Sequence, residues 1–211
     1  FGNVISRRNR PDFYYRGKRQ VLARWPDSGF ATAGKAVGAT DLEETWIKVH
    51  GTVEGCLEYK DDRISKWAGE PEACVFGYWY WDWADGYSGL TSVDPEKKVF
   101  TLEKPWSGYG YRDGMRFYGL NLLCELDAPG EYYFDNADGC IYWYAPDGFD
   151  HEDSRTEFSV SEAAYLITVN ECFGFSIDGF TLKGGRNGAL KVSGGDGASV
   201  SNCRFCCFGE N

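Results

Sequence analysis

The pattern of apolar and polar positions changes late in the chain. Before that change, short runs with period-two alternation are separated by turn sequences, which is typical of antiparallel β-structure. Ala128–Glu131 fits a type II turn, because Pro129 fixes φ at the second position and Gly130 accepts positive φ at the third. Asn136–Gly139 is the next turn. We therefore expect residues 1–150 to form an antiparallel β domain that is barrel-like or sandwich-like.

Several local elements are expected within this domain. Gly17 supplies the turn of a hairpin at residues 12–25, and residues 97–104 read as a strand. Residues 46–49 are a further strand candidate, and residues 58–70 show weak helical spacing of apolar side chains.

Short apolar runs recur at a fixed interval near the C-terminal end of the chain. The shift is 23 residues, and Gly174 matches Gly197 at this shift. The apolar matches are Ile167 with Leu190, Val169 with Val192, Ile177 with Val200, Phe180 with Cys203 and Leu182 with Phe205. Two brief strands in each short repeat indicate a β-solenoid, in which parallel strands of successive coils pair and like residues stack. The L-x-x-L-x-L pattern of leucine-rich repeats is absent.

We expect residues 151–211 to be the start of a right-handed parallel β-helix, with Gly and Asn at the corners. About two coils fit this stretch, whereas solenoids usually need about three repeats and caps. The chain begins with Phe1 and ends at Asn211, inside the repeat. We interpret it as a fragment of a longer parent chain. Its coils would be stabilised by packing against the β domain or against further N-terminal and C-terminal coils of that parent chain.

Composition supports an all-β protein. Aromatic residues make up 17% of the chain, and 27 glycines are available for turns. The formal net charge is −10. An acidic chain without an extended basic run lacks the electrostatic signature of nucleic-acid or anionic-membrane binding. No apolar run approaches the ~20 residues of a membrane span, so we expect neither nucleic acid nor membrane as a partner.

Eight cysteines are present, and Cys203, Cys206 and Cys207 form a CxxCC cluster. A metal site there would need further soft ligands, but the two histidines, His50 and His151, are distant in sequence. Packing as buried free thiols is the simpler interpretation, and the sequence also allows disulfides. We expect no metal and no cofactor.

Four segments of the sequence suggest a family. They read RGKRQVLARWPDSGF (16–30), YWYWDWADGY (78–87), NLLCELDAPGEYYFDNADGCIYWYAPDG (121–148) and FSIDGFTLKGGRNGALKVSGG (175–195). Together they resemble bacterial right-handed parallel β-helix proteins similar to glycoside hydrolase family 141, which includes α-L-fucosidase and xylanase activities. The resemblance implies that residues 1–150 are a domain inserted into the helix. It also implies that the catalytic carboxylates lie on later coils, so no catalytic residue carries over to this chain.

Two acidic residues are candidates for catalysis within the chain itself. Glycoside hydrolysis usually needs two carboxyl groups that flank the bond. Glu125 and Asp127 are two residues apart in an expected strand, so they would share one face about 6.5 Å apart. The alternative is a structural role, because Asp127 precedes a Pro-Gly turn where Asp commonly binds local backbone amides.

The aromatic segment is a candidate for sugar binding. In a strand, Trp79, Trp81 and Trp83 would share one face, with Asp82 on the other. The tryptophans would then stack against sugars or fill a sheet core. Asp82 and Asp85 are the polar contact candidates beside Trp81.

Three further residues complete the candidate set for substrate binding. Tyr109 belongs to a Gly-rich loop that would rim a cleft or be a plain loop. Arg186 and Asn187 lie at a corner between coil strands, where Asn also forms structural ladders.

These observations together favour a fragment of a carbohydrate-active β-helix protein, namely a glycoside hydrolase with its catalytic carboxylates mostly outside this chain. Its partner would be a polysaccharide or oligosaccharide. The alternatives are a non-catalytic carbohydrate-binding or adhesion β-helix, and a polysaccharide lyase. The resemblance implies an extracellular or periplasmic location, whereas free thiols would favour the cytoplasm.

Overall fold

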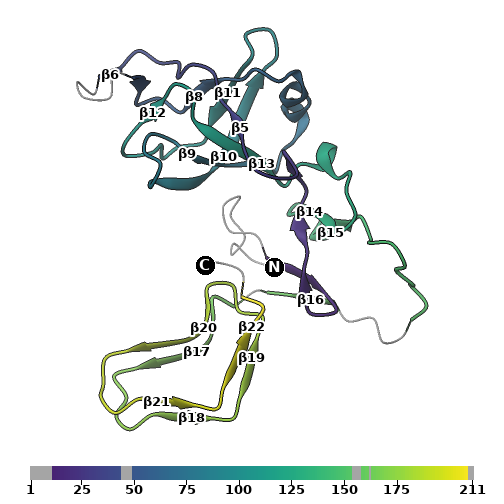
Figure 1. Cartoon of the computed structure of the whole chain (residues 1–211), viewed down its shortest axis with the longest axis vertical. Coiled ribbons are helices and arrows are strands. Elements are labelled where there is room, and N and C mark those ends of the chain that lie inside the picture. The colour runs from purple at the N-terminus through teal and green to yellow at the C-terminus, as the bar shows by residue number, and fades with distance from the viewer. Residues whose placement is uncertain (1–10, 44–48, 154–157, 162, 209–211) are drawn as a thin grey trace. The chain divides into compact units, whose positions relative to one another are not determined.

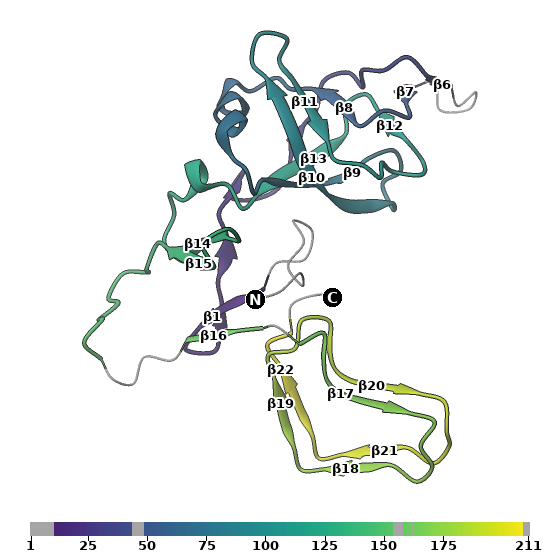
Figure 2. The ribbon, with the colours of Figure 1, turned by 180° about the vertical axis from the view of Figure 1, so that it is seen from behind.

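The computed structural model describes residues 11–43, 49–153, 158–161 and 163–208 (Figures 1 and 2). Within them the protein is all-β, with several antiparallel sheets and two short 3₁₀ helices. The chain divides into two compact units. One contains Val21–Asp147 and is called the β domain, and the other contains Pro11–Gln20 with Gly148–Asn211 and is called the coil unit.

The main sheet of the β domain has seven strands. In spatial order they are β4 (Arg24–Trp25), β13 (Arg116–Leu120), β9 (Cys74–Tyr78), β10 (Asp85–Asp94), β11 (Val99–Leu102) and β8 (Cys56–Glu58), and β5 (Ala31–Thr32) also pairs with β13. β11 falls within the strand expected at residues 97–104. All these pairings are antiparallel.

Two smaller sheets belong to the same domain. One orders β12 (Tyr111–Arg112), β7 (His50–Thr52) and β6 (Asp41–Glu43), and the other orders β15 (Cys140–Trp143), β14 (Glu131–Asp135) and β3 (Val21–Leu22). The expected turns flank β14: the Glu131 amide donates to the Ala128 carbonyl, and Gly139 has a φ of 66° before β15. The described strands form separate sheets, so the closed barrel that we allowed for is wrong.

Two 3₁₀ helices complete the β domain. They are η1 (Asp62–Gly69), within the stretch of weak helical spacing, and η2 (Leu123–Glu125). Asp61 caps η1 by accepting from the Arg63 amide, and η1 buries Ile64 and Trp67. The strand expected at residues 46–49 falls largely outside the described residues.

Large aromatic residues form the core of the β domain. Trp67 and Trp79 pack against the inner face of the main sheet together with Phe100 and Phe117. Glycine makes this approach sterically feasible, because a Cβ on Gly77 would lie 2.7 Å from the Trp79 ring.

The coil unit begins with the expected hairpin. β1 (Phe13–Tyr15) and β2 (Lys18–Arg19) are joined through Arg16 and Gly17, which both have positive φ. β16 (Phe158–Val160) pairs with β1 on its other side.

The remaining strands of the coil unit pair in parallel across the expected interval. The pairs are β17 (Tyr165–Asn170) with β20 (Gly188–Ser193), β18 (Ser176–Asp178) with β21 (Ser199–Ser201) and β19 (Thr181–Lys183) with β22 (Arg204–Cys206). Ile167 lies opposite Leu190 and Ile177 opposite Val200, which confirms the 23-residue shift. Figure 1 shows the two successive turns of chain one above the other.

The cysteines differ from expectation. None of the eight is in a disulfide. Cys74 is buried, Cys124, Cys140 and Cys172 are exposed, and the other four are half-buried. The three cysteines of the CxxCC cluster are therefore only partly buried, not fully buried as expected. Among the residues with described positions, no cluster of His, Cys, Asp and Glu has the arrangement of a metal site. Likewise, none of the described helices is long and apolar enough to cross a membrane.

Candidate functional site

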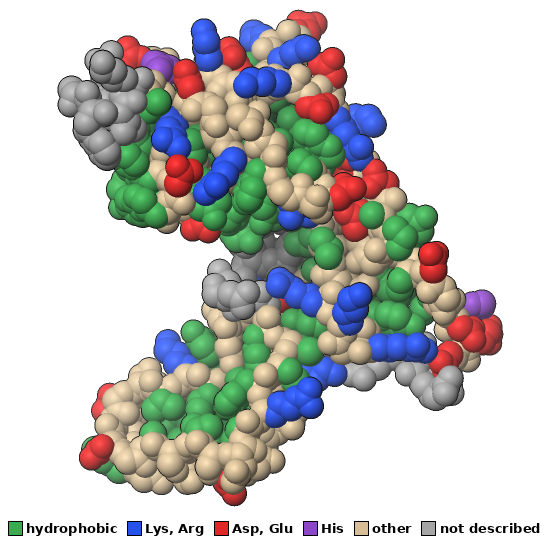
Figure 3. Space-filling model, viewed as in Figure 1, with side chains coloured by type: hydrophobic (Ala, Val, Ile, Leu, Met, Phe, Trp, Pro, Cys, Tyr) green, Lys and Arg blue, Asp and Glu red, His purple; other side chains and the backbone are tan. Residues whose placement is uncertain are grey.

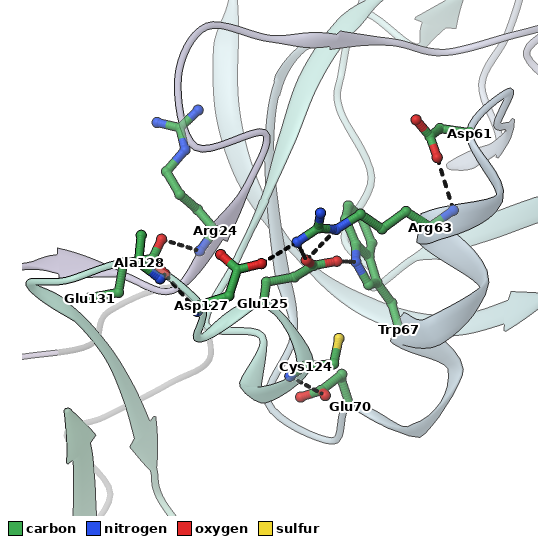
Figure 4. A network of polar contacts seen from close by, with 10 residues as sticks. All are labelled: Arg24, Asp61, Arg63, Trp67, Glu70, Cys124, Glu125, Asp127, Ala128 and Glu131. Atoms are coloured by element: carbon green, nitrogen blue, oxygen red, sulfur yellow. Dashed lines mark hydrogen bonds and ion pairs between the residues drawn. The ribbon is translucent and has the colours of Figure 1, made fainter. Parts of the chain in front are cut away.

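Glu125 and Asp127 meet at one arginine (Figure 4). Arg63 donates from Nε to Glu125 at 2.6 Å and from Nη2 to Asp127 at 2.5 Å. Trp67 donates from Nε1 to the other Glu125 oxygen at 2.9 Å. The two hydrogen bonds that Arg63 donates raise its pKa, and the bond to Glu125 is the largest cause.

This arrangement differs from the expected catalytic pair. Glu125 ends the 3₁₀ helix η2 and is fully buried, and Asp127 follows in the turn, so the expected strand is wrong. A buried carboxylate that is bound by a guanidinium and an indole is well suited to join η1 to η2.

Two more carboxylates hold the same segment of chain. Glu70 accepts from the amides of Leu123 and Cys124, and Glu131 accepts from the amides of Asp127 and Ala128 (Figure 4). Burial raises the pKa of Glu131, and these amide hydrogen bonds oppose the rise. The acidic residues of this region therefore satisfy backbone donors that would otherwise lack partners.

The tryptophan-rich segment does not continue as a strand. β9 ends at Tyr78, and residues 79–84 form a turn before β10. Trp79 enters the core, Trp81 is half-buried and Trp83 is exposed. The expected stripe of three tryptophans on one strand face is therefore wrong.

Two tryptophans and a tyrosine form an exposed group that we call the loop platform (Trp81, Trp83 and Tyr109). The rings of Trp81 and Trp83 are nearly parallel, with centroids 6.4 Å apart, and Tyr109 meets Trp83 edge-on at 5.2 Å. Trp83 is 67% exposed and Tyr109 is 53% exposed. Large rings this accessible are more typical of a binding surface than of a core.

Asp82 lies in the same turn between two arginines. Its carboxylate is 3.3 Å from Arg112 Nη2 and 3.5 Å from Arg116 Nη2. Its side chain remains exposed, so a polar acceptor of fixed position stands beside the loop platform.

The outward side of the main sheet carries a second set of rings, which we call the sheet face (Phe30, Phe76, Tyr78, Tyr87 and Tyr118). Tyr118, Phe76 and Tyr87 lie opposite one another on β13, β9 and β10. The Phe76 centroid is 5.0 Å from that of Tyr118 and 4.8 Å from that of Tyr87. Phe30 precedes β5 and contacts Phe76, Tyr78 and Tyr118.

Two arginines stack on this sheet face. The Arg24 guanidinium lies 3.8 Å from the Tyr118 ring centroid, and that of Arg116 lies 4.0 Å from the Tyr78 centroid. Because Arg116 also pairs with Asp82, it connects the sheet face to the loop platform.

The sequence candidates are thus only partly brought together. Trp81, Asp82 and Tyr109 gather at the loop platform, and exposed Asp85 lies opposite Tyr78 at the edge of the sheet face. Figure 3 shows hydrophobic, basic and acidic side chains side by side on the β domain. Such a surface offers ring faces to apolar C–H groups and charged edges to hydroxyl groups, which is the chemistry that sugars require.

Sequence reasoning missed the sheet face itself. The available signal was the alternation in Cys74–Tyr78 and Arg116–Leu120, which places Phe76, Tyr78 and Tyr118 on one side. That signal shows which residues share a side, but it does not show which side faces solvent.

Arg186 and Asn187 belong to the coil unit. Their amides donate to the carbonyls of Ala163 and Ala164, so they form the corner that leads into β20. Asn187 is exposed, whereas Arg186 is buried. The corner position is as expected, and a role of either side chain in binding stays a prediction.

Comparison with known proteins gives a structural similarity only. No family model and no curated protein matches the chain. A solved structure described as "Glycoside hydrolase" is similar with a TM-score of 0.60 and 15% sequence identity, over 84% of this chain. The chain spans about a third (32%) of that structure's length. The protein therefore has a fold like that of part of a glycoside hydrolase.

Proposed function

We propose that this chain is part of a carbohydrate-active protein of the glycoside hydrolase type, and that its β domain binds polysaccharide. The loop platform is the observation that carries this proposal. Exposed Trp83 and Tyr109 offer ring faces to sugar C–H groups, and Asp82 offers an acceptor beside them. The structural similarity to a glycoside hydrolase supports the same conclusion.

The coil unit is proposed to be part of a right-handed parallel β-helix, like that of glycoside hydrolase family 141. Parallel pairing at a constant shift of 23 residues supports this interpretation. Because the chain corresponds to about a third of the similar structure, we place the catalytic carboxylates in the remainder of a longer protein. Glu125 and Asp127 then serve stability rather than catalysis.

A binding experiment tests the role of the loop platform. Titration calorimetry with neutral xylo-oligosaccharides and fucosylated oligosaccharides should show binding that Trp83→Ala weakens several-fold, since the most exposed ring contact is lost. Tyr144→Ala is the matched control, because Tyr144 is 46% exposed and is not part of the platform. Absence of binding, or equal losses in both variants, would overturn the proposal.

A second candidate function uses the same surface without catalysis. A carbohydrate-binding or adhesion β-helix would also need exposed Trp83 and Tyr109. The discriminating measurement is glycan hydrolysis by a full-length protein that contains this chain. Binding that depends on Trp83 without any turnover would favour the non-catalytic function.

A further inference from the structure

The sheet face is an ordered surface whose most accessible rings are Phe30 and Tyr87. They are 43% and 44% exposed, respectively. Beneath them, Phe76 and Tyr118 pack against each other with ring planes 25° apart. Strand pairing fixes the spacing of these rings, so the surface is formed before any ligand arrives.

Arg24 brings a positive charge to this surface. Its Nε donates to the Pro26 carbonyl at 2.7 Å, and its Nη2 donates to the Gly29 carbonyl at 2.8 Å. These bonds and the Tyr118 ring hold the guanidinium in place. A guanidinium has five N–H donors, so two bonds leave three for a ligand.

The charge of Arg24 is not cancelled by an ion pair. Burial lowers the pKa of Arg24, and Tyr118, Asp27 and Glu131 oppose that shift. No carboxylate among the described residues lies within ion-pair distance of it. Arg116, at the other edge of the sheet face, differs in this respect because Asp82 pairs with it. One edge of the aromatic surface therefore carries a guanidinium without an ion pair to a described carboxylate, whereas at the other edge Asp82 is shared by Arg116 and Arg112.

Two phenol groups adjoin the guanidinium. Tyr118 and Tyr87 both interact electrostatically with Arg24. A bound carboxylate would therefore find a guanidinium and polar hydroxyl groups beside apolar ring faces. That combination suits a ligand with an apolar ring face and a carboxylate at one edge.

We propose that the sheet face binds the acidic sugar units of a polysaccharide, with Arg24 holding the carboxylate and Phe30 and Tyr87 packing against the sugar ring. This inference rests on the proposed carbohydrate-binding function and names the class of sugar. Uronic acid units have the required chemistry, because their carboxylate projects from the edge of a pyranose ring. Local charge decides this preference, despite the overall charge of −10.

Binding of tetragalacturonate and of its methyl ester tests the proposal. The two ligands have the same sugar backbone and differ at the carboxyl group, which is charged in the acid and neutral in the ester, so their affinity ratio in the unmodified protein reports the carboxylate contact. We expect the acid to bind on the order of tenfold more tightly than the ester. Arg24→Gln should reduce the acid-to-ester affinity ratio to about one. Tyr87→Ala should weaken both ligands several-fold.

A control variant separates local from general electrostatics. Lys35→Gln also removes one positive charge from the β domain, and the Lys35 side chain is exposed and outside the sheet face. It should keep the preference for the acid. If Arg24→Gln does not fold, the acid-to-ester affinity ratio is still measured in the unmodified protein, in Tyr87→Ala and in Lys35→Gln. A ratio near one in the unmodified protein then overturns the proposal.

The outcomes also separate this inference from the proposed function. Equal binding of acid and ester, or a preference lost equally in Lys35→Gln, would overturn the role of Arg24. If neutral oligosaccharides bind in a Trp83-dependent manner and the acid does not bind, the proposed function stands and this inference falls. If no oligosaccharide binds, both fall.

Discussion

Three neighbouring tryptophans show how burial is decided residue by residue. Trp79 is buried, Trp81 is half-buried and Trp83 is exposed, although they alternate regularly in the sequence. The strand ends at Tyr78, so the period-two rule no longer applies beyond it. Gly77 then leaves the space that Trp79 occupies against the sheet.

Removing the partner of Glu125 should strongly destabilise the β domain. Arg63→Met leaves a buried carboxylate without its cation, and we expect a loss of about 3 kcal/mol in the free energy of unfolding. Urea denaturation of both proteins, monitored by tryptophan fluorescence, measures this difference in the free energy of unfolding.

The exposed partner of the same arginine provides the control. Asp127→Asn removes a pairing at the surface and should cost less than about 1 kcal/mol. The opposite outcome would be a Glu125→Gln variant with unchanged stability that abolishes glycan turnover by a full-length protein. That result would contradict the structural role of Glu125 and support a catalytic one.

The pKa of His50 should lie above the ordinary histidine value of 6.5. The hydrogen bond from His50 to Asp113 raises its pKa above 6.5, and Asp41 contributes as well. The raised pKa means that the charged form is favoured by folding. The associated stabilisation is fully present below pH 6.5 and is lost as the pH rises through the higher folded value. Exposure of the ring makes the effect on stability small.

An NMR titration of the His50 ring protons measures this pKa directly. Asp113→Asn should move it back toward 6.5, because the negative charge is removed. The asparagine oxygen can still accept from the Ala36 amide, so the loop that Asp113 anchors is kept. An unchanged pKa in this variant would show that Asp113 is not the cause.

At the scale of elements, glycine determines how the helix η1 packs on the main sheet. A Cβ on Gly119 of β13 would lie 2.5 Å from the Trp67 ring of η1. Glycine at positions 77 and 119 leaves room on the inner face of the sheet for the rings of Trp79 and Trp67. Aromatic residues can therefore pack on both faces of the sheet.

Gly119→Ala should therefore destabilise the β domain by about 1–3 kcal/mol through overpacking. Gly69→Ala is the control, because a Cβ there meets nothing within 4 Å and Gly69 does not need positive φ. Thermal unfolding of the two variants measures the difference. Equal melting temperatures would show that Trp67 moves aside without cost.

At the scale of the whole chain, the two units differ in how well they bury apolar residues. The β domain buries Trp67, Phe100 and Phe117 almost completely. In the coil unit, Val200 and Phe205 are each 45% exposed. The strands that carry them, β21 and β22, each pair with a described strand on one side.

Hydrogen exchange should reflect that difference. Amides in β9, β10 and β13 should exchange at least tenfold more slowly than amides in β20 to β22 of the same molecule, because the latter lie in the less buried unit. Mass-resolved or NMR-detected exchange on the intact chain measures both sets together. Equal protection would contradict the view that the coil unit is the less stable part.

The sequence by itself determined the local features. Gly17, Gly130 and Gly139 mark turns because positive φ is a property of single residues. The 23-residue shift predicted parallel pairing because stacked coils repeat the same inward positions.

The tertiary structure alone decided where the charged and aromatic side chains meet. Arg63 lies 62 residues from Glu125, and Arg24 is far in sequence from Tyr118, so no local pattern links them. The sequence also could not show that Glu125 is buried while Trp83 is exposed, since both facts depend on how distant segments cover one another. Local backbone preferences depend on a few neighbouring residues, so they can be predicted from the sequence. A binding surface depends on which side chains remain exposed after distant segments pack together.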